Sequence, residues 1–136
     1  MILVDTGPLV ALFDPRDDAH ATAQQKLSTL SDELMTTVPV LAEAFYLLGP
    51  ASRGSAGLRE FVMRGALSLW WFSERSLQRA FRLMDDYADQ PMDLADASLV
   101  TAAEALRTTR VFTIDRKDFL AYRVRIGRTA RGFTLV

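Results

Sequence analysis

Hydrophobic and polar positions form short apolar runs that alternate with longer, periodically apolar segments along the chain. The short runs are typical of buried strands and lie at residues 1–4, 34–37, 67–72, 110–114 and about 132–136. The longer segments repeat apolar residues every three or four positions and predict helices at residues 6–13, about 18–30, 38–48, 58–65, 74–88 and 94–107. This alternation predicts an α/β fold whose sheet is parallel and is covered by helices on both faces.

Residues with known positional preferences mark the ends of several predicted helices. Pro39 and Gly49 bracket one helix, Ser73 can cap another, and Asp93 can cap the helix that follows Pro91. Three polar or glycine-rich segments separate the periodic ones and are expected to form a loop, a flexible connection and a turn, at residues 14–18, 50–57 and 115–119.

The chain has 136 residues, of which 49% are hydrophobic, and it contains no internal repeat or low-complexity segment. This length is typical of one domain with its own core, so we expect a single domain over residues 1–136. There is no cysteine, and the first residues lack the basic region and cleavage site of a signal peptide. No apolar run approaches the roughly 18 residues that a membrane span needs, so we expect a cytoplasmic protein without membrane contact.

Charge is distributed unevenly, although the formal net charge is only −1. Residues 1–104 carry 8 Lys and Arg against 15 Asp and Glu, whereas residues 105–136 carry 8 against 2. Nearly all the basic residues are arginines, whose guanidinium group matches phosphate oxygens in shape and charge. The C-terminal segment therefore suits contact with a nucleic-acid backbone, although a solvated basic surface or a protein-binding edge would show the same pattern.

Two aspartates directly follow predicted strands. Asp5 ends the first strand and Asp115 ends the fourth. If these strands are neighbours in a parallel sheet, both carboxylates emerge at the same edge, where open α/β sheets bind their ligands. Each aspartate also has a simpler explanation, because this residue is common as a helix cap and in turns.

Two further acids lie in apolar surroundings. Glu43 is the only charged residue of its helix and falls between Val40 and Leu47 in the apolar band, where a solvated glutamate is not expected. Asp96 falls near the third position of its helix and leads into the apolar face that follows. A position at the edge of the band would explain Glu43 without a ligand, and the helix dipole would stabilise Asp96.

Four carboxylates that meet in one cleft cannot all stay ionised unless a cation compensates their charge. Oxygen ligands without cysteine, and with His20 as the single histidine, favour a hard divalent ion, Mg²⁺ or Mn²⁺ rather than Zn²⁺. Mg²⁺ keeps waters and substrate phosphates among its ligands, so such a site suits phosphate chemistry. An RNA-cleaving mechanism that needs two histidines is excluded, and we expect His20 to lie on the surface.

Four segments together resemble the motifs of PIN-domain ribonucleases, and specifically the VapC-type toxins of type II toxin–antitoxin systems. In chain order they are ILVDTGPLVALFD with Asp5 and Thr6, VLAEAFYLL with Glu43, MDLADASLVTAAEAL with Asp96, and VFTIDRKDF with Asp115. The resemblance covers essentially the whole chain. It implies a three-layer α/β/α sandwich with a central, mostly parallel sheet.

The resemblance also implies an activity, and assigns roles to these residues. It implies a Mg²⁺- or Mn²⁺-dependent endoribonuclease, with one or two ions, that hydrolyses RNA to 5′-phosphate and 3′-hydroxyl ends. Asp5 and Asp96 carry over as the principal metal ligands, Glu43 and Asp115 as further catalytic ligands, and Thr6 as the residue that orients Asp5. The implied partners are transfer or ribosomal RNA, a cognate antitoxin that blocks the acidic pocket, and a second copy of the chain in a homodimer.

The arginines of the C-terminal segment are expected to contact the RNA backbone, namely Arg116, Arg123, Arg125, Arg128 and Arg131. The alternative function is a PIN-like module that binds RNA or protein without cleaving it. A haloacid-dehalogenase-like phosphatase is disfavoured because it needs Asp-x-Asp where this chain has Asp5-Thr6-Gly7. A phospho-accepting receiver domain is disfavoured because it needs a lysine at the end of a late strand, where this chain has Asp115.

Overall fold

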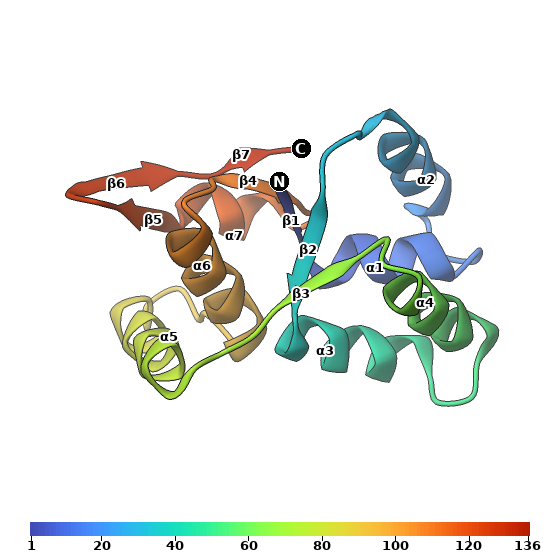
Figure 1. Ribbon diagram of the computed structural model, residues 1–136, viewed down its shortest axis with the longest axis horizontal. Coiled ribbons are helices and arrows are strands. Elements are labelled where there is room, and N and C mark those ends of the chain that lie inside the picture. The colour runs from blue at the N-terminus through green and yellow to red at the C-terminus, as the bar shows by residue number, and fades with distance from the viewer.

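The computed structural model describes residues 1–136 and contains seven helices, a five-stranded sheet and a separate two-stranded hairpin (Figure 1). The strands are Ile2–Val4 (β1), Leu34–Thr37 (β2), Ser68–Trp70 (β3), Arg110–Phe112 (β4), Arg123–Ile126 (β5), Thr129–Gly132 (β6) and Thr134–Leu135 (β7). The helices are Thr6–Phe13 (α1), His20–Thr29 (α2), Val38–Leu48 (α3), Arg53–Met63 (α4), Glu74–Asp86 (α5), Leu94–Leu106 (α6) and Arg116–Ala121 (α7).

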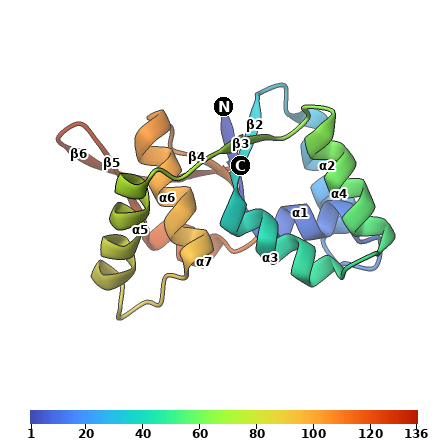
Figure 2. The same cartoon turned by 60° about the horizontal axis from the view of Figure 1, so that its bottom comes forward.

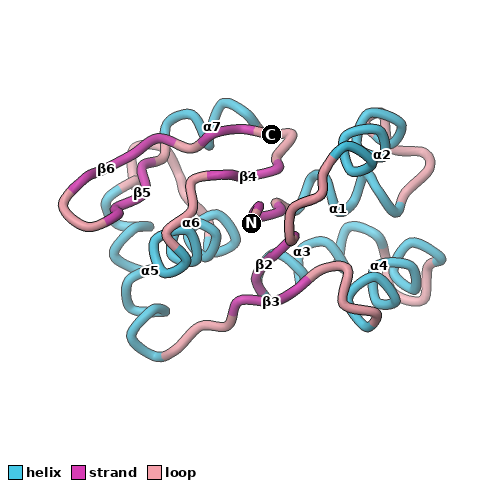
Figure 3. Tube along the Cα trace, turned by 45° about the horizontal axis from the view of Figure 1, so that its top comes forward, coloured by secondary structure: helices cyan, strands magenta, loops and turns pink.

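The sheet has the order β3-β2-β1-β4-β7, and every neighbouring pair of strands is parallel. Helices α1 to α4 gather on one side of it and α5 to α7 on the other (Figures 1 and 2). Figure 3 shows the strands of this sheet as a band between these two groups of helices, with the β5–β6 hairpin outside it. The predicted three-layer α/β/α sandwich with a parallel sheet is therefore confirmed. None of the helices is long and apolar enough to span a membrane.

Strand β1 is the centre of the core because it is apolar on both faces. Ile2 and Leu3 are fully buried, and the strand pairs in parallel with β2 on one side and β4 on the other. The chain builds outward from β1 to β3 and then returns to β4, on the opposite side of β1. The direction of winding thus reverses between β1 and β4, which is the position where doubly wound sheets open a crevice for ligands.

The segment at residues 50–57, expected to be a flexible connection, instead contains the first turns of α4. Ser52 caps this helix by accepting a hydrogen bond from the backbone N–H of Ser55 at 3.0 Å. Gly54 faces α1, and a β-carbon there would lie 2.6 Å from the carbonyl oxygen of Phe13. The glycines therefore allow two helices to pack closely rather than breaking one of them.

Other expectations about local structure were also wrong or incomplete. Most of residues 115–119, expected to form a turn, belong to the short helix α7 instead, and the β5–β6 hairpin was not expected at all. The strand expected at about 132–136 is reduced to β7. Helix α2, expected from about residue 18, begins at His20 and has no side-chain cap; the Asp17 carboxylate accepts from the backbone N–H of Ala19 in the turn before it.

Gly54→Ala is expected to destabilise the protein by about 1–3 kcal/mol, because the added methyl group overlaps the Phe13 carbonyl in a packed contact. Helix propensity alone predicts a gain of about 0.5–1 kcal/mol from this change. Ala56→Gly, at an exposed position of the same helix, is the control and should lose about that amount. Urea unfolding measures both variants, and a stabilised Gly54→Ala protein would show that α4 does not require the close approach.

Candidate active site

An acidic cleft of about 370 Å³ opens at the carboxyl edge of the sheet, beside the ends of β1 and β4. Six carboxylate side chains line it and no basic residue does: Asp5, Glu43, Asp93, Asp96, Asp115 and Asp118. The remaining lining residues are Thr6, Gly7, Leu47, Pro91 and Ile114. The structure thus brings together all four acids that the sequence singled out, from two strand ends and from helices α3 and α6.

Asp5 lies at the end of the central strand and is the most buried of these acids, with 6% of its surface exposed. One carboxylate oxygen accepts a hydrogen bond from the backbone N–H of Thr6 at 2.8 Å, and the other accepts from the Thr113 hydroxyl at 2.9 Å. Burial raises the pKa of Asp5 to about 6 in spite of these two hydrogen bonds, and the charges of Glu43 and Asp115 add to the rise.

Asp96 lies in the first turn of α6, facing the cleft, and is half-buried. Its carboxylate accepts a hydrogen bond of 2.7 Å from the hydroxyl of Tyr122. Burial raises the pKa of Asp96 to about 7, and the charges of Asp93, Asp5 and Asp118 contribute. Burial and the Asp96 carboxylate also raise the pKa of Tyr122 above its ordinary value, so this hydroxyl stays protonated and donates.

Asp93 is the N-cap of α6, as the sequence predicted, and accepts from the Asp96 backbone N–H at 2.8 Å. Asp115 precedes α7 and lines the cleft, but its side chain makes no cap hydrogen bond to the backbone of the helix. Asp118 lies three residues further along the chain, and interaction with the Asp115 side chain raises the pKa of Asp118. Glu43 is half-buried at the edge of the apolar band of α3.

Two residues that orient the acids were not singled out from the sequence. Thr113 is buried beyond the end of β4, where its hydroxyl donates to Asp5 and accepts from the Asp115 backbone N–H at 3.0 Å. Tyr122 reaches Asp96 from the far end of α7. Thr6, which was expected to orient Asp5, donates to it through its backbone N–H, while its buried hydroxyl has no hydrogen-bond partner.

The single histidine takes no part in the cleft. His20 is half-buried rather than on the surface as expected, and its Nδ1 atom lies 2.7 Å from the carbonyl oxygen of Ala11. No histidine, cysteine or lysine lines the acidic cleft, so every ionisable side chain in it is a carboxylate. Acid, base and ligand roles in this cleft therefore fall to carboxylates and to groups that hydrogen-bond with them.

The acids share a cleft but do not form one compact ligand set, because no group of three converges closely enough to hold a metal ion directly. The carboxylates of Asp5 and Asp96 are each held by a separate hydroxyl, that of Thr113 and that of Tyr122. The donor chemistry nevertheless fits a hard divalent cation that retains several of its waters. All side-chain donors are oxygens, no cation of the protein lines the cleft, and the Thr6 hydroxyl lacks a partner.

The arginines expected to contact RNA lie outside the acidic cleft and are all exposed, at positions 116, 123, 125, 128 and 131. Arg125 and Arg123 belong to β5, and Arg131 belongs to β6. Arg123 is already engaged, because its Nη1 donates to the carbonyl oxygens of Leu120 and Tyr122 at the end of α7, at 2.9 and 3.0 Å. The predicted contacts with RNA thus depend on a surface next to the cleft rather than on its wall.

The sequence pattern that defines the PIN domain family matches residues 2–124. This chain belongs to the PIN-domain family. Among characterised relatives of this PIN domain, Ribonuclease VapC26 from Mycobacterium tuberculosis (strain ATCC 25618 / H37Rv) is 32% identical over 126 residues. The matched region covers 90% of this chain and 92% of that protein. Both findings confirm the resemblance to VapC-type ribonucleases that the four motifs predicted.

Solved structures share the fold of this PIN domain. The crystal structure of Mycobacterium tuberculosis VapC20, a toxin that cleaves the sarcin–ricin loop, has a TM-score of 0.78 at 19% identity and covers 87% of this chain and 94% of that chain. A toxin–antitoxin complex from Klebsiella pneumoniae has a TM-score of 0.69 at 21% identity, covering 89% and 92%. VapBC2 from Rickettsia felis, bound to a promoter DNA fragment, has a TM-score of 0.64 at 17% identity, covering 100% and 98%.

The stability of the metal-free PIN domain is expected to fall as the pH rises from about 5 to about 8. The folded-state pKa values of Asp5 and Asp96, about 6 and about 7, exceed the ordinary aspartate value of about 4. The folded protein therefore binds more protons than the unfolded chain in this window, and deprotonation favours unfolding. In Asp96→Asn the fall should be smaller, and at pH 8 this variant should be at least as stable as the parent.

Thermal unfolding at several pH values in the presence of a chelator measures this effect. Asp93→Asn is the control, because asparagine also caps helices and Asp93 contributes only secondarily to the raised pKa of Asp96. Its pH dependence should stay close to that of the parent. A large loss of metal-free stability in Asp96→Asn would show instead that the fold needs the ionised carboxylate beneath Tyr122.

Proposed function

We propose that this PIN domain is a Mg²⁺- or Mn²⁺-dependent endoribonuclease that hydrolyses RNA to 5′-phosphate and 3′-hydroxyl ends, as the toxin of a type II toxin–antitoxin pair. The observation that carries the proposal is the acidic cleft, which gathers six carboxylates and no basic residue beside β1 and β4. Carboxylates alone repel a phosphodiester, so a cleft of this composition can act on RNA only with cations between them. The 32% sequence identity to Ribonuclease VapC26 also supports RNA cleavage as the reaction.

Asp5 and Asp96 would hold the cation directly, and Glu43 and Asp115 would hold it with the help of water. Asp5 and Asp96 are suited to this role because burial and like charges disfavour their ionised forms, and a divalent ion would favour them. When bound, the ion supplies a water of lowered pKa and positive charge next to the phosphoryl oxygens.

The protein's own contribution is to keep the carboxylates oriented. The Thr6 N–H and the Thr113 hydroxyl hold both oxygens of Asp5, and the Tyr122 hydroxyl holds one oxygen of Asp96. Groups that orient ligands in this way typically contribute about 10–100-fold to metal affinity or activity. Thr113 and Tyr122 therefore join the candidate site as positioning residues.

We further propose that the chain works as a single domain in the cytoplasm, with a cognate antitoxin and as a homodimer. Solved structures with this fold include a toxin–antitoxin complex from Klebsiella pneumoniae and VapBC2 from Rickettsia felis. Large apolar side chains are available for such partners, since Tyr46, Leu47 and Trp71 are 81%, 56% and 66% exposed. Ribosomal RNA is a candidate substrate by analogy with VapC20, and transfer RNA is the other.

Asp5→Asn and Asp96→Asn are each expected to lower the rate of RNA cleavage by more than about 100-fold, beyond the loss typical of residues that only orient ligands. Tyr122→Phe removes one such orienting hydroxyl and should fall within the 10–100-fold range. Asp18→Asn, at an exposed position outside the cleft, is the control and should cleave like the parent. Cleavage of a structured RNA with Mg²⁺, with and without a chelator, measures these rates.

The chemistry of the product ends separates the proposal from its alternatives. Mass spectrometry should find 5′-phosphates and 3′-hydroxyls, because the attacking oxygen comes from water and not from the 2′-hydroxyl of the substrate. Cyclic phosphate ends would contradict the hydrolytic mechanism. Binding of Mg²⁺ and RNA without any cleavage would favour the alternative, a PIN-like binding module.

A further inference from the structure

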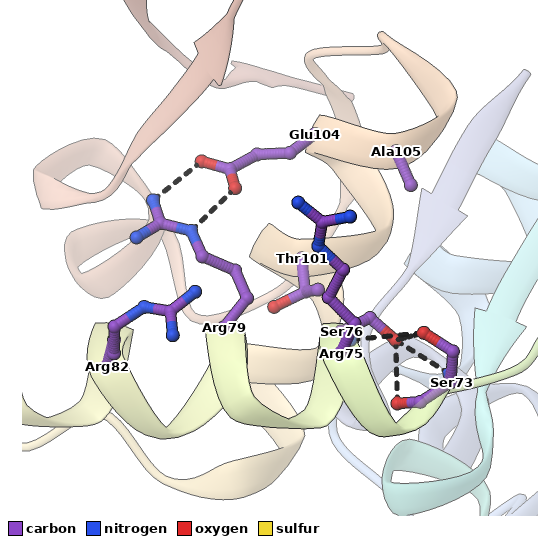
Figure 4. A pocket seen from close by; sticks show the side chains of 8 residues that line it. All are labelled: Ser73, Arg75, Ser76, Arg79, Arg82, Thr101, Glu104 and Ala105. Carbon is purple, nitrogen blue, oxygen red and sulfur yellow. Dashed lines mark hydrogen bonds and ion pairs between the residues drawn. The ribbon is translucent and has the colours of Figure 1, made fainter.

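A groove between α5 and α6 is lined by arginines and shares no residue with the acidic cleft (Figure 4). Its volume is about 380 Å³. Figure 4 shows Arg75, Arg79 and Arg82 rising from one face of α5 toward α6, which contributes Thr101 and Glu104. Positions three and four residues apart lie on the same face of a helix, so the sequence of α5 itself aligns these three guanidinium groups.

Two of the three guanidinium groups in this groove have no partner within the protein. Arg79 is neutralised by Glu104, with Nε and Nη2 at 2.9 and 3.0 Å from the two carboxylate oxygens. Arg75 and Arg82 are exposed and form neither an ion pair nor a hydrogen bond. The serines at the entrance are already used, because Ser73 and Ser76 bond to each other as the capping box of α5. The groove therefore presents free positive charge.

A second groove of about 300 Å³ continues the first, since both are lined by Arg79 and Glu104. It adds Arg123 and Arg125 from β5, together with Asp86. We call the two together the arginine groove. It gathers five arginines against the two acids Asp86 and Glu104, in a chain whose net charge is −1.

The arginine groove reaches the acidic cleft through two tyrosines. Tyr87 lines the groove, and its hydroxyl accepts from the backbone N–H of Arg123 at 2.9 Å. Its ring packs edge-on against Tyr122, with 5.3 Å between ring centroids, and the Tyr122 hydroxyl donates to Asp96. One pair of aromatic rings therefore separates the nearest wall of the groove from a predicted metal ligand.

We propose that the arginine groove binds the phosphate backbone of the RNA substrate on one side of the scissile bond, with Arg75, Arg82 and Arg125 as phosphate contacts. The proposal rests on the function proposed above. The acidic cleft has no basic residue of its own, so phosphates that flank the cleaved bond must be held elsewhere. The guanidinium fork matches phosphate oxygens, and contacts of this kind position a nucleic acid without reading its sequence.

The lining of the groove favours RNA over a protein segment as its occupant. Only one of the eight residues that line the first groove is hydrophobic, namely Ala105. A protein helix that docks in a groove does so through apolar anchors that enter pockets, and this part of the groove offers none. An acidic partner protein is therefore the alternative that the experiment must distinguish.

The double variant Arg75→Gln/Arg82→Gln tests the proposal, because glutamine removes both charges and keeps a good helix former in α5. Binding of a fluorescent single-stranded RNA is measured by anisotropy at several salt concentrations, with a chelator present to prevent cleavage. The slope of log K against log salt should flatten by about 1.4, at about 0.7 for each lost phosphate contact. Affinity should weaken alike for RNAs of different sequence.

The matched control is Arg53→Gln/Arg59→Gln, which removes two exposed arginines of α4 on the other side of the sheet. Its salt slope should equal that of the parent, and an equal flattening in both variants would overturn the proposal. In cleavage assays, the Arg75→Gln/Arg82→Gln variant (the α5 variant) should have a higher KM than the parent for a long RNA. Its KM for a trinucleotide, which is too short to extend from the acidic cleft to the arginine groove, should rise less. Equal effects on both substrates would also overturn the proposal.

Two further outcomes separate this inference from related ones. If the α5 variant binds RNA like the parent but loses affinity for a co-expressed antitoxin, the groove is a protein-binding surface and the proposal is wrong. In the other outcome, the parent binds RNA with the expected salt slope and the α5 variant has a flatter slope, but the parent cleaves no RNA with Mg²⁺. That result would support the groove as the RNA-binding surface and contradict the proposed catalytic function.

Discussion

The buried carboxylate of Asp5 is the constraint around which the site is arranged. It lies at the end of the central strand with 6% of its surface exposed, next to other acids of the same cleft. A buried charge without compensation is costly, and two hydrogen bonds from Thr6 and Thr113 offset only part of that cost, since the pKa remains raised to about 6. The folded protein thus holds unfavourable charge at the one place where a divalent ion would relieve it.

The sheet and helix α6 create this arrangement through ordinary packing. The apolar strand β1 must be covered on both faces, and the reversal of winding beside it leaves a crevice at its carboxyl end. The Thr37 hydroxyl at the end of β2 lies 2.6 Å from the Ser98 hydroxyl, which fixes the first turns of α6 against β2. Asp96, two residues earlier, is thereby held over the crevice while Tyr122 fixes its carboxylate.

The molecule carries two neighbouring surfaces of opposite charge, the acidic cleft and the arginine groove. The acidic cleft is lined by six carboxylates and no basic residue, which suits cations and disfavours the phosphates of a nucleic acid, whereas the arginine groove gathers five arginines against two acids, which suits phosphates. Tyr87 and Tyr122 join the two surfaces. A nuclease that cuts a long RNA needs a cation-binding site and a phosphate-binding surface close enough for one RNA molecule to contact both.

The sequence predicted most of the fold and the four acids because each left a local signal. Continuous apolar runs marked the buried strands, and Glu43 broke the pattern of an otherwise apolar helix. The hairpin β5–β6 left only a weak signal, because β5 contributes just Val124 and Ile126 between arginines and every residue of its partner strand β6 is exposed.

The positioning residues and the arginine groove could not be predicted in this way. Thr113 and Tyr122 act across contacts between elements that are distant in sequence from the acids they hold. The charge count likewise pointed to the C-terminal segment, whereas the free arginines of α5 lie in a part of the chain that is acidic overall. The spacing of Arg75, Arg79 and Arg82 places them on one face of α5, but the groove that they line depends on how α5 packs against α6 and β5, which the sequence does not report.

The most direct test of this account is the position of a bound Mn²⁺ ion. Anomalous diffraction from crystals grown with Mn²⁺ would locate the ion without reference to activity. The account predicts a peak in the acidic cleft between the carboxylates of Asp5 and Asp96, and its loss in crystals of the Asp96→Asn variant. No peak in the cleft, or a dominant peak beside other acids such as Asp32 and Glu33, would contradict it.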